Sequence, residues 1–237
     1  MKPVLAATGL SKRYSSRVAL VEASLAICAG EFVVVVGASG SGKTTLFRCL
    51  TRLIEPDSGT IEIDGQRLNG VAGRALAVQR RKIGVVFQQF NLVRRLSALQ
   101  NVLAARLADT PLWRVALRLF PAADEERAMA ALAAVGLADH MHQRADTLSG
   151  GQQQRVAIAR ALAQDCRMIL ADEPVASLDP ETAVSILALL HDLTRTNGLA
   201  VLCTLHQPDL AQRFADRILV MRNGRLGRPS QPRRTAT

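Results

Sequence analysis

Strand-like apolar runs alternate with helix-like segments along most of the chain. Short apolar runs rich in β-branched residues predict buried strands. Strands are expected at 31–36, 60–63, 83–87, 168–171, 200–205 and 218–221. A helix is expected at 43–53, closed by the turn at 55–59, and another at about 180–195, where Pro180 takes a favoured early position. This alternation predicts an α/β fold with a mostly parallel sheet and crossover helices.

The middle of the chain has a different pattern. From 98 to 136 the sequence is rich in Ala, Leu and Arg and contains no strand-like run, which predicts an insertion of two or three helices. With the helix expected after the glycine turn near 150, this helical subdomain extends over about 98–162. No period of 20 to 50 residues recurs, so a repeat architecture is excluded.

Composition sets the class of protein. Of the 237 residues 49% are apolar, which is enough for a sizeable core. The longest uninterrupted apolar run, 32–36, is too short to cross a bilayer. The amino-terminal residues show no charged, apolar and small-residue pattern, so no signal peptide is expected. Any work at a membrane would therefore be done from its surface, through a partner. None of the four cysteines is spaced as a metal-binding pair, which predicts free thiols in a reducing compartment.

The formal net charge of +10 fits three kinds of partner: nucleic acid, an anionic membrane surface or nucleotide phosphate. No acidic residue follows Asp216, and the arginines beyond it are Arg217, Arg222, Arg225, Arg228, Arg233 and Arg234. This basic tail, 227–237, is either a solvated, partly disordered end or a segment attracted to anionic lipid. Few aromatic residues occur and none interleave with basic ones, which argues against nucleic acid as a partner.

Residues 37–44 read Gly-Ala-Ser-Gly-Ser-Gly-Lys-Thr, which matches the phosphate-loop motif between a predicted strand and a predicted helix. The glycines let backbone N–H groups point at phosphates, and the helix amino terminus adds partial positive charge. Lys43 can reach the β- and γ-phosphates, and the Thr44 hydroxyl can ligate Mg²⁺. The expected nucleotide contacts of this loop are Gly37, Ala38, Ser39, Gly40, Ser41, Gly42, Lys43, Thr44 and Thr45.

Two carboxylates, Asp172 and Glu173, end the apolar strand at 168–171. Ligands of open parallel sheets bind beyond the carboxyl ends of the strands. Asp172 is therefore expected to hold Mg²⁺ through water, and Glu173 to polarise the attacking water as a general base. Alone, such a pair before Pro174 also fits a helix cap, but the phosphate loop in the same chain favours the catalytic interpretation.

A second candidate anion site lies more than 100 residues after the first. Residues 148–152 read Leu-Ser-Gly-Gly-Gln and open a predicted helix, with Ser149 as its natural cap. A serine and two glycines at a helix start can bind an anion. One domain has little use for two phosphate sites, so the second is expected to serve the ATP of a partner.

The phosphate loop and the Leu-Ser-Gly-Gly-Gln segment together resemble the nucleotide-binding subunit of ABC transporters, over about residues 4–226. The resemblance implies a P-loop NTPase (RecA-like) core with a mostly parallel sheet, an N-terminal antiparallel β-subdomain and the inserted helical subdomain, so that 1–226 is one nucleotide-binding domain. It also implies a head-to-tail homodimer that sandwiches ATP and Mg²⁺. The segment that meets the partner's ATP consists of Ser149, Gly150, Gly151 and Gln152.

The same resemblance assigns four single residues. Tyr14 would stack on adenine, although a half-buried strand residue also fits its position. Gln88 would sense Mg²⁺ and signal to the membrane partner; Gln89 is adjacent, but the spacing favours Gln88. Asp179 would communicate across the dimer, and His206 would contact the γ-phosphate. With Glu173 in place no catalytic position is missing, which predicts an active ATPase.

Three stretches, 87–97, 171–180 and 204–208, are similar to phosphonate-import ATP-binding proteins. The segment 110–120 is similar as well, although ordinary packing of Trp113, Leu117 and Phe120 would also explain it. After 223–225 the family usually continues with an aromatic-Asp-Gly turn and a further helix, whereas this chain reads Leu-Gly-Arg-Pro-Ser at 226–230.

The similarity implies an importer ATPase subunit at the cytoplasmic face of the bacterial inner membrane, with two permease subunits and a periplasmic solute-binding protein that selects the solute. Transport of another solute, such as amino acids or lipoproteins, is the alternative. A soluble ABC protein acting on nucleic acid is disfavoured, because no second cassette or long insertion is present.

Overall fold

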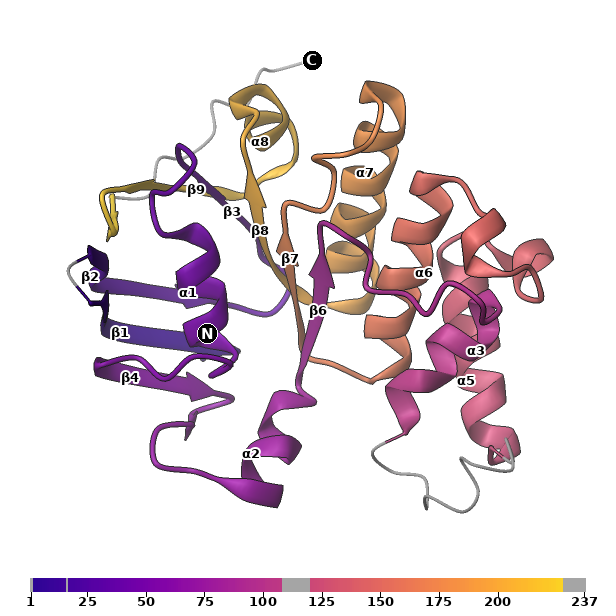
Figure 1. Cartoon of the computed structure of the whole chain (residues 1–237), viewed down its shortest axis with the longest axis horizontal. Helices are drawn as coiled ribbons and strands as arrows, with labels where there is room; N and C mark the ends of the chain where they lie inside the picture. Colours follow the sequence, from indigo (N-terminus) through magenta and orange to yellow (C-terminus); the bar gives the residue numbers. More distant parts are fainter. Residues whose placement is uncertain (1, 16, 108–119, 228–237) are drawn as a thin grey trace.

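The computed structural model describes residues 2–15, 17–107 and 120–227. Among them, six strands form a central sheet in the order β10-β9-β3-β8-β7-β6, with every pair parallel except β10 and β9 (Figure 1). The strands are β3 Phe32–Val36, β6 Ile83–Phe87, β7 Met168–Asp172, β8 Ala200–Leu205, β9 Arg217–Arg222 and β10 Arg225–Leu226. The predicted mostly parallel sheet is confirmed.

The parallel strands are apolar throughout because both faces of their sheet are covered. In β3, Phe32 and Val34 pack into one hydrophobic cluster, whereas Val33 and Val35 pack into the other. The first cluster is completed by helices α3, α5, α6 and α7, and the second by helix α1 and the antiparallel strands. Their bounds are α1 Lys43–Leu50, α3 Ala98–Leu103, α5 Ala122–Ala134, α6 Gly150–Ala163 and α7 Pro180–Asn197.

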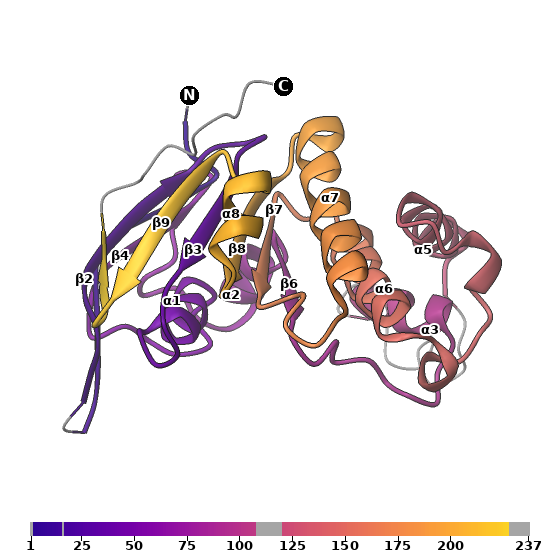
Figure 2. The same cartoon turned by 90° about the horizontal axis from the view of Figure 1, so that it is seen from above.

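A second sheet, entirely antiparallel, covers one side of the core in the order β2-β1-β4-β5. Its strands are β1 Leu5–Tyr14, β2 Arg17–Ile27, β4 Ser58–Ile63 and β5 Gln66–Arg67. Figure 2 shows this sheet at one end of the molecule and helices α3 and α5 at the other, with the parallel sheet between. Both subdomains implied by the family resemblance are thus present in the fold.

The predicted boundaries shift by a few residues. Helix α1 ends at Leu50 and not at residue 53, because Arg52 has a left-handed backbone (φ 51°). The sequence does not predict helix α2 (Gly73–Arg80), because none of its residues is fully buried and Leu76 alone packs against the core. Helix α8 (Pro208–Phe214) was not expected either, and it is only 7 residues long.

The helical region contains α3, the short 3-10 helix η1 (Ala104–Arg106), α5 and α6. Trp113 and Leu117 lie outside the described residues, as does the tail beyond Gly227. The division into one domain at 1–226, with a helical subdomain at 98–162, stays a prediction. The four cysteines are free; three of them are buried, and Cys28 is half-buried. Burial raises the pKa of Cys49 and Cys166 to about 11.

Candidate functional site

The phosphate loop runs from the end of β3 to the start of α1. At two of its glycines a larger residue would collide with the backbone of a neighbouring strand. A Cβ on Gly37 would lie 2.5 Å from the carbonyl oxygen of Met221. Gly42 caps α1 with φ 113°, and a Cβ there would lie 2.4 Å from the carbonyl oxygen of Ala19. The loop therefore forms a cradle whose backbone passes close to β2 and β9, and only glycine fits at these points.

Polar groups in this cradle suit an anion. Lys43 is buried, and its Nζ donates to the carbonyl oxygens of Gly37 (2.8 Å) and Ala38 (3.2 Å). Ser41 is also buried, and its hydroxyl has no hydrogen-bond partner among the described residues. A buried cation held at a helix amino terminus beside an unsatisfied hydroxyl is a site in which phosphate oxygens would complete the hydrogen bonds.

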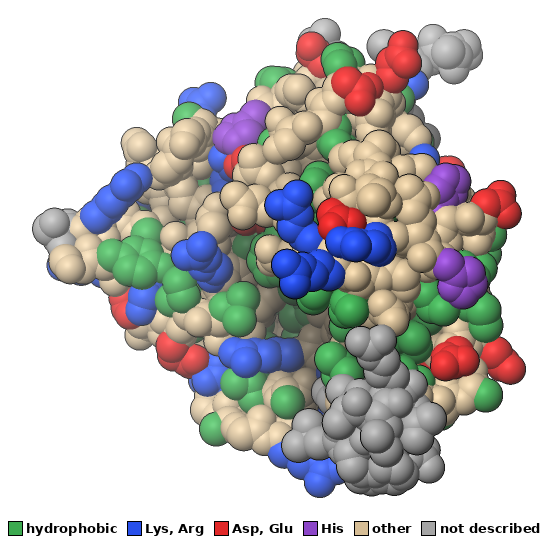
Figure 3. All heavy atoms as spheres, turned by 45° about the vertical axis from the view of Figure 1, so that its right-hand side comes forward, with side chains coloured by type: hydrophobic (Ala, Val, Ile, Leu, Met, Phe, Trp, Pro, Cys, Tyr) green, Lys and Arg blue, Asp and Glu red, His purple; other side chains and the backbone are tan. Residues whose placement is uncertain are grey.

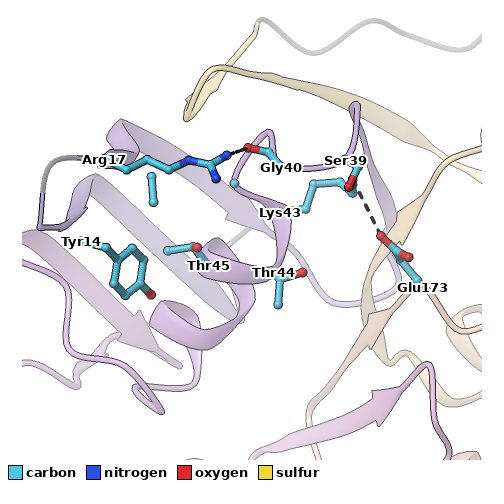
Figure 4. Close-up of a pocket in the computed structure, with 10 residues that line it drawn as sticks. Tyr14, Arg17, Ser39, Gly40, Lys43, Thr44, Thr45 and Glu173 are labelled. Atoms are coloured by element: carbon cyan, nitrogen blue, oxygen red, sulfur yellow. Dashed lines mark hydrogen bonds and ion pairs between the residues drawn. The ribbon is translucent and has the colours of Figure 1, made fainter.

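An open pocket of about 280 Å³ lies beside the loop (Figure 4). Its lining combines loop residues, a carboxylate from the other side and side chains from the antiparallel sheet: Tyr14, Arg17, Ala19, Ser39, Gly40, Gly42, Lys43, Thr44, Thr45 and Glu173. Tyr14 is 40% exposed and lines this pocket at the end of β1. Tyr14 is therefore a half-exposed residue of a strand, and its ring also offers the pocket a surface on which a base could stack.

The carboxyl end of β7 carries both acidic residues, and Thr204 on the neighbouring strand connects them. Asp172 pairs with Thr204 across the parallel ladder. The buried Thr204 hydroxyl donates to Asp172 Oδ1 (2.9 Å) and accepts from the backbone N–H of Glu173 (2.8 Å). Burial, the largest cause, raises the pKa of the Asp172 carboxyl, although the Thr204 hydrogen bond opposes the shift.

Glu173 points into the pocket and meets two other predicted site residues. Its Oε1 lies 2.6 Å from His206 Nε2 and 3.8 Å from Lys43 Nζ. Its backbone is left-handed (φ 51°), a conformation that costs energy for a non-glycine residue and is frequent at functional sites. The structure thus brings Lys43, Glu173 and His206 together from three separate segments of the chain.

A small cavity beside α1 is lined by Thr44 and Asp172, together with Arg48, Thr51 and mainly apolar side chains. A hydroxyl and a carboxylate are ligands that Mg²⁺ accepts, and this ion is usually held by one or two carboxylates together with phosphate oxygens. Within the described ranges no cluster of three or more His, Cys, Asp or Glu side chains could hold a metal by itself. Thr44 and Asp172 therefore fit a Mg²⁺ ion whose remaining ligands come from the phosphates of a bound nucleotide. Gln88 follows β6 and is exposed, and it lines neither of these two cavities.

We expect Asp172→Asn to lower Mg²⁺-dependent turnover by roughly 10- to 100-fold, the usual effect of losing a group that orients a metal site. The same change should not lower stability. Because the pKa of Asp172 is raised above 3.8, the folded chain binds this proton more tightly than the unfolded chain. Ionisation therefore lowers stability progressively as the pH rises from 3.8 through the raised value, and the loss is complete above it.

The amide introduced by Asp172→Asn would carry no charge and could still accept the Thr204 hydrogen bond. Thermal melts at pH 5 and pH 7.5, without nucleotide, check the second half of this prediction. A melting temperature well below that of the unsubstituted chain at pH 7.5 would contradict it, as would unchanged Mg²⁺ dependence of turnover.

The segment 149–152 begins α6 with a capping box. The Ser149 hydroxyl accepts from the Gln152 backbone N–H (3.2 Å), and the Gln152 side chain accepts from the Ser149 backbone N–H (2.9 Å). A Cβ on Gly151 would lie 2.4 Å from Thr182 Cγ2, so this turn packs tightly against the start of α7. Ser149 is exposed, and no residue of this segment lines the pocket beside the phosphate loop.

Asp179 caps α7 beside this turn. Its carboxylate accepts from the backbone N–H of Thr182 (2.9 Å), and hydrogen bonds to Thr182 lower its pKa. Because Thr182 also contacts the position of Gly151, the Asp179 loop and the start of α6 form one packed unit. In a single chain this unit and the phosphate-loop pocket are two separate surfaces.

Comparison with known proteins decides the family. The ABC transporter family model matches residues 20–176, which is more than half of the chain. The chain belongs to the ABC transporter family. Family membership confirms the predicted P-loop fold, the assignment as an ABC-type ATPase and ATP as the nucleotide.

Among curated ABC proteins, the chain is 49% identical over 217 residues to the hypophosphite import ATP-binding protein HtxD of Stutzerimonas stutzeri, covering 92% of this chain and 64% of that protein. It is 48% identical over 226 residues to the phosphonates import ATP-binding protein PhnC of Lactobacillus acidophilus, covering 95% of this chain and 88% of that protein. The chain thus spans slightly less than two thirds of the length of HtxD and most of the length of PhnC.

Solved ABC cassettes have the same fold. A dimeric structure of MJ0796, a bacterial ABC transporter cassette, superposes with a TM-score of 0.83 at 36% identity, covering 97% of this chain and 99% of that one. The structure of cbiO1 from Clostridium perfringens, part of an ABC transporter complex, gives a TM-score of 0.86 at 28% identity, covering 98% and 90% of the two chains.

Two residues of the ABC site were missed in the sequence. Thr204 lies two residues before His206 inside an apolar strand, and only the register of β7 against β8 shows that it faces Asp172. Arg17 lies three residues after Tyr14, and only the pairing of β1 with β2 brings it to the pocket. Both residues are recognised only once the register of the paired strands is known, and the pattern of apolar residues within one strand does not show that register.

Proposed function

We propose that two copies of this chain bind two ATP molecules between them, and that each copy supplies a phosphate loop to one ATP and the 149–152 segment to the other. The observation that carries the proposal is the separation of two anion-suited surfaces in one chain. Lys43, Glu173 and His206 converge at the pocket, whereas the exposed Ser149 lies outside it. A second copy of the chain supplies what the pocket lacks.

In this site each residue has a distinct task. Glu173 accepts a proton from the attacking water as general base. His206 Nε2 lies 2.6 Å from Glu173 Oε1 and so orients the carboxylate. Lys43 neutralises phosphate charge from its buried position. Thr44 and Asp172 would hold Mg²⁺, which supplies further neutralisation of the β- and γ-phosphates when bound.

We propose that the segment after β6 carries changes at the site to the helical region. Phe87 pairs with Asp172 in the sheet, and Gln88 follows directly. A few residues later, the backbone carbonyl oxygens of Phe90 and Asn91 accept hydrogen bonds from Arg160 on α6, at 3.2 and 2.6 Å. Movement near Gln88 is therefore tied to the helix that Ser149 caps.

A groove beside this segment suits a protein partner. It lies between α2, β6 and α6, and Arg80, Arg81 and Arg160 line it. On the face shown in Figure 3, Lys and Arg side chains gather around the middle of the molecule. Through this groove each copy of the chain would bind one of two permease subunits at the cytoplasmic side of the bacterial inner membrane. Among the helices of the described residues, none has both the length and the apolar character to span a bilayer.

The solute is proposed from the relatives. HtxD is named for hypophosphite import and PhnC for phosphonates import, and both are nearly half identical to this chain over more than nine tenths of it. We therefore propose that ATP hydrolysis drives uptake of a phosphonate or a related phosphorus oxyanion, selected by a periplasmic solute-binding protein.

The test is transport by the full complex. With its permease and binding protein in proteoliposomes, the chain should drive ATP-dependent uptake of methylphosphonate or hypophosphite, and the Glu173→Gln complex should not. Uptake of an amino acid in place of either phosphorus compound would overturn the proposed solute while leaving the ATPase assignment intact.

A further inference from the structure

A side chain outside every sequence motif reaches the nucleotide pocket from the β1–β2 hairpin. Arg17 begins β2 and pairs with Tyr14 across the antiparallel ladder. Residues paired in this way carry their side chains on the same face. Both side chains line the pocket beside the phosphate loop. The end of the hairpin thus presents an aromatic ring and a guanidinium side by side.

Arg17 is attached to the phosphate loop itself. Its guanidinium donates to the carbonyl oxygen of Gly40 at 2.8 Å (Figure 4). Gly40 has a left-handed backbone (φ 74°), and a Cβ there would lie 3.0 Å from the same guanidinium nitrogen. The hydrogen bond therefore fixes the cation at the rim of the loop.

Most donors of this guanidinium are left for a ligand. An arginine side chain carries five N–H donors in a planar fork that matches phosphate oxygens. The bond to Gly40 is the one hydrogen bond that the Arg17 side chain makes within the described part of the chain, and no carboxylate there pairs with it. Within the described residues, the charge of Arg17 is therefore not neutralised by a carboxylate.

The position of Arg17 along the pocket indicates which part of the nucleotide it would contact. In Figure 4, Tyr14 and Arg17 lie at one end of the pocket and Glu173 lies at the other. Hydrolysis requires the γ-phosphate near Glu173, and the base would stack on Tyr14. Arg17, between Tyr14 and the loop, is then nearest to the phosphate that joins the ribose.

We propose that Arg17 is a nucleotide-binding residue that donates to the α-phosphate of ATP while it holds Gly40. The inference rests on the proposed function, because it needs ATP in this pocket. Since ATP and ADP share the α-phosphate, Arg17 contributes equally to the affinity of both.

The test is a set of titrations of the purified full chain with Mg-ATP and Mg-ADP. Arg17→Ala removes both the charge and the donor, Arg17→Gln keeps a donor for Gly40 without charge, and Arg17→Lys keeps the charge. Arg13→Ala, in the same hairpin but outside the pocket lining, is the matched control for lost charge. Arg17→Ala and Arg17→Gln should weaken both nucleotides by roughly tenfold, the loss expected for one charge-assisted hydrogen bond. Arg17→Lys should lose less, and Arg13→Ala should match the unsubstituted chain.

Three results would overturn the assignment. A loss confined to ATP would place the contact at the γ-phosphate. Full affinity in Arg17→Gln would show that the side chain acts only by holding Gly40. An equal loss of nucleotide affinity in Arg13→Ala would show that the effect comes from long-range electrostatics and not from a contact of Arg17. If the unsubstituted chain bound neither nucleotide, the proposed function itself would fail, which is a separate outcome.

Discussion

Replacing Glu173 by Gln lowers the rate of ATP turnover by roughly 10²- to 10⁴-fold, the range that a positioned general base contributes. A neutral amide cannot take the proton of the attacking water. Its amide oxygen can still face His206 Nε2, which lies 2.6 Å from Glu173 Oε1. The local geometry is therefore kept while the chemistry is lost.

ATP should remain bound in this variant, because the carbonyl oxygens of Gly37 and Ala38, at 2.8 and 3.2 Å, hold Lys43 Nζ more closely than Glu173 does at 3.8 Å. Steady-state phosphate release measures turnover, and nucleotide titration measures binding. Glu126→Gln makes the same chemical change on the exposed surface of α5 and should leave both unchanged. Turnover within a few-fold of the unsubstituted chain in Glu173→Gln would remove Glu173 from the catalytic role.

Replacing Ser149 by Arg should reduce turnover to the level of the Glu173→Gln variant, although no atom of Ser149 lines the pocket of its own chain. The side chain is exposed at the start of α6, on the surface proposed to meet the partner's ATP. A large cation there would hold the two copies apart. Nucleotide affinity of the single chain should be unaffected.

The substitution also removes a helix cap, since the Ser149 hydroxyl accepts from the Gln152 backbone N–H. Loss of such a cap costs about 1 kcal/mol of stability. Ser149→Ala removes the same cap without added bulk or charge, and Ala133→Arg adds the same side chain on the exposed surface of α5. Both controls should retain more activity than Ser149→Arg. Equal activity of Ser149→Arg and Ala133→Arg would contradict the proposed contact.

The phosphate loop and the acidic pair could be located in the sequence because each combines a chemical requirement with a local backbone signal. The phosphate loop needs glycine where β2 and β9 pass close by, and Gly37 and Gly42 are the positions at which a Cβ would collide. The Asp172–Glu173 pair ends a strand that is apolar because both faces of its sheet are covered. These features act within a few residues, so they are visible in a linear pattern.

Contacts between distant segments could not be predicted in this way. The bridge from Thr204 to Asp172 depends on the register of β8 against β7, which apolar strands of similar length do not fix in the sequence. The packing of Thr182 against Gly151 depends on where α7 begins relative to α6. Arg17 resembles any other surface arginine until β1 and β2 are paired. Helix α2 has no fully buried residue and packs only Leu76 against the core, so it shows no clear apolar period.

The most direct test of the paired mechanism is the molecular mass in solution with and without ATP, measured for Glu173→Gln and for Glu173→Gln combined with Ser149→Arg. Slow turnover in the first variant should let the ATP-bound dimer accumulate. The second should bind ATP equally well and remain a monomer. If the doubly substituted chain also dimerises with ATP, or if Glu173→Gln stays monomeric while saturated with ATP, then the 149–152 segment does not complete the partner's site and the account is wrong.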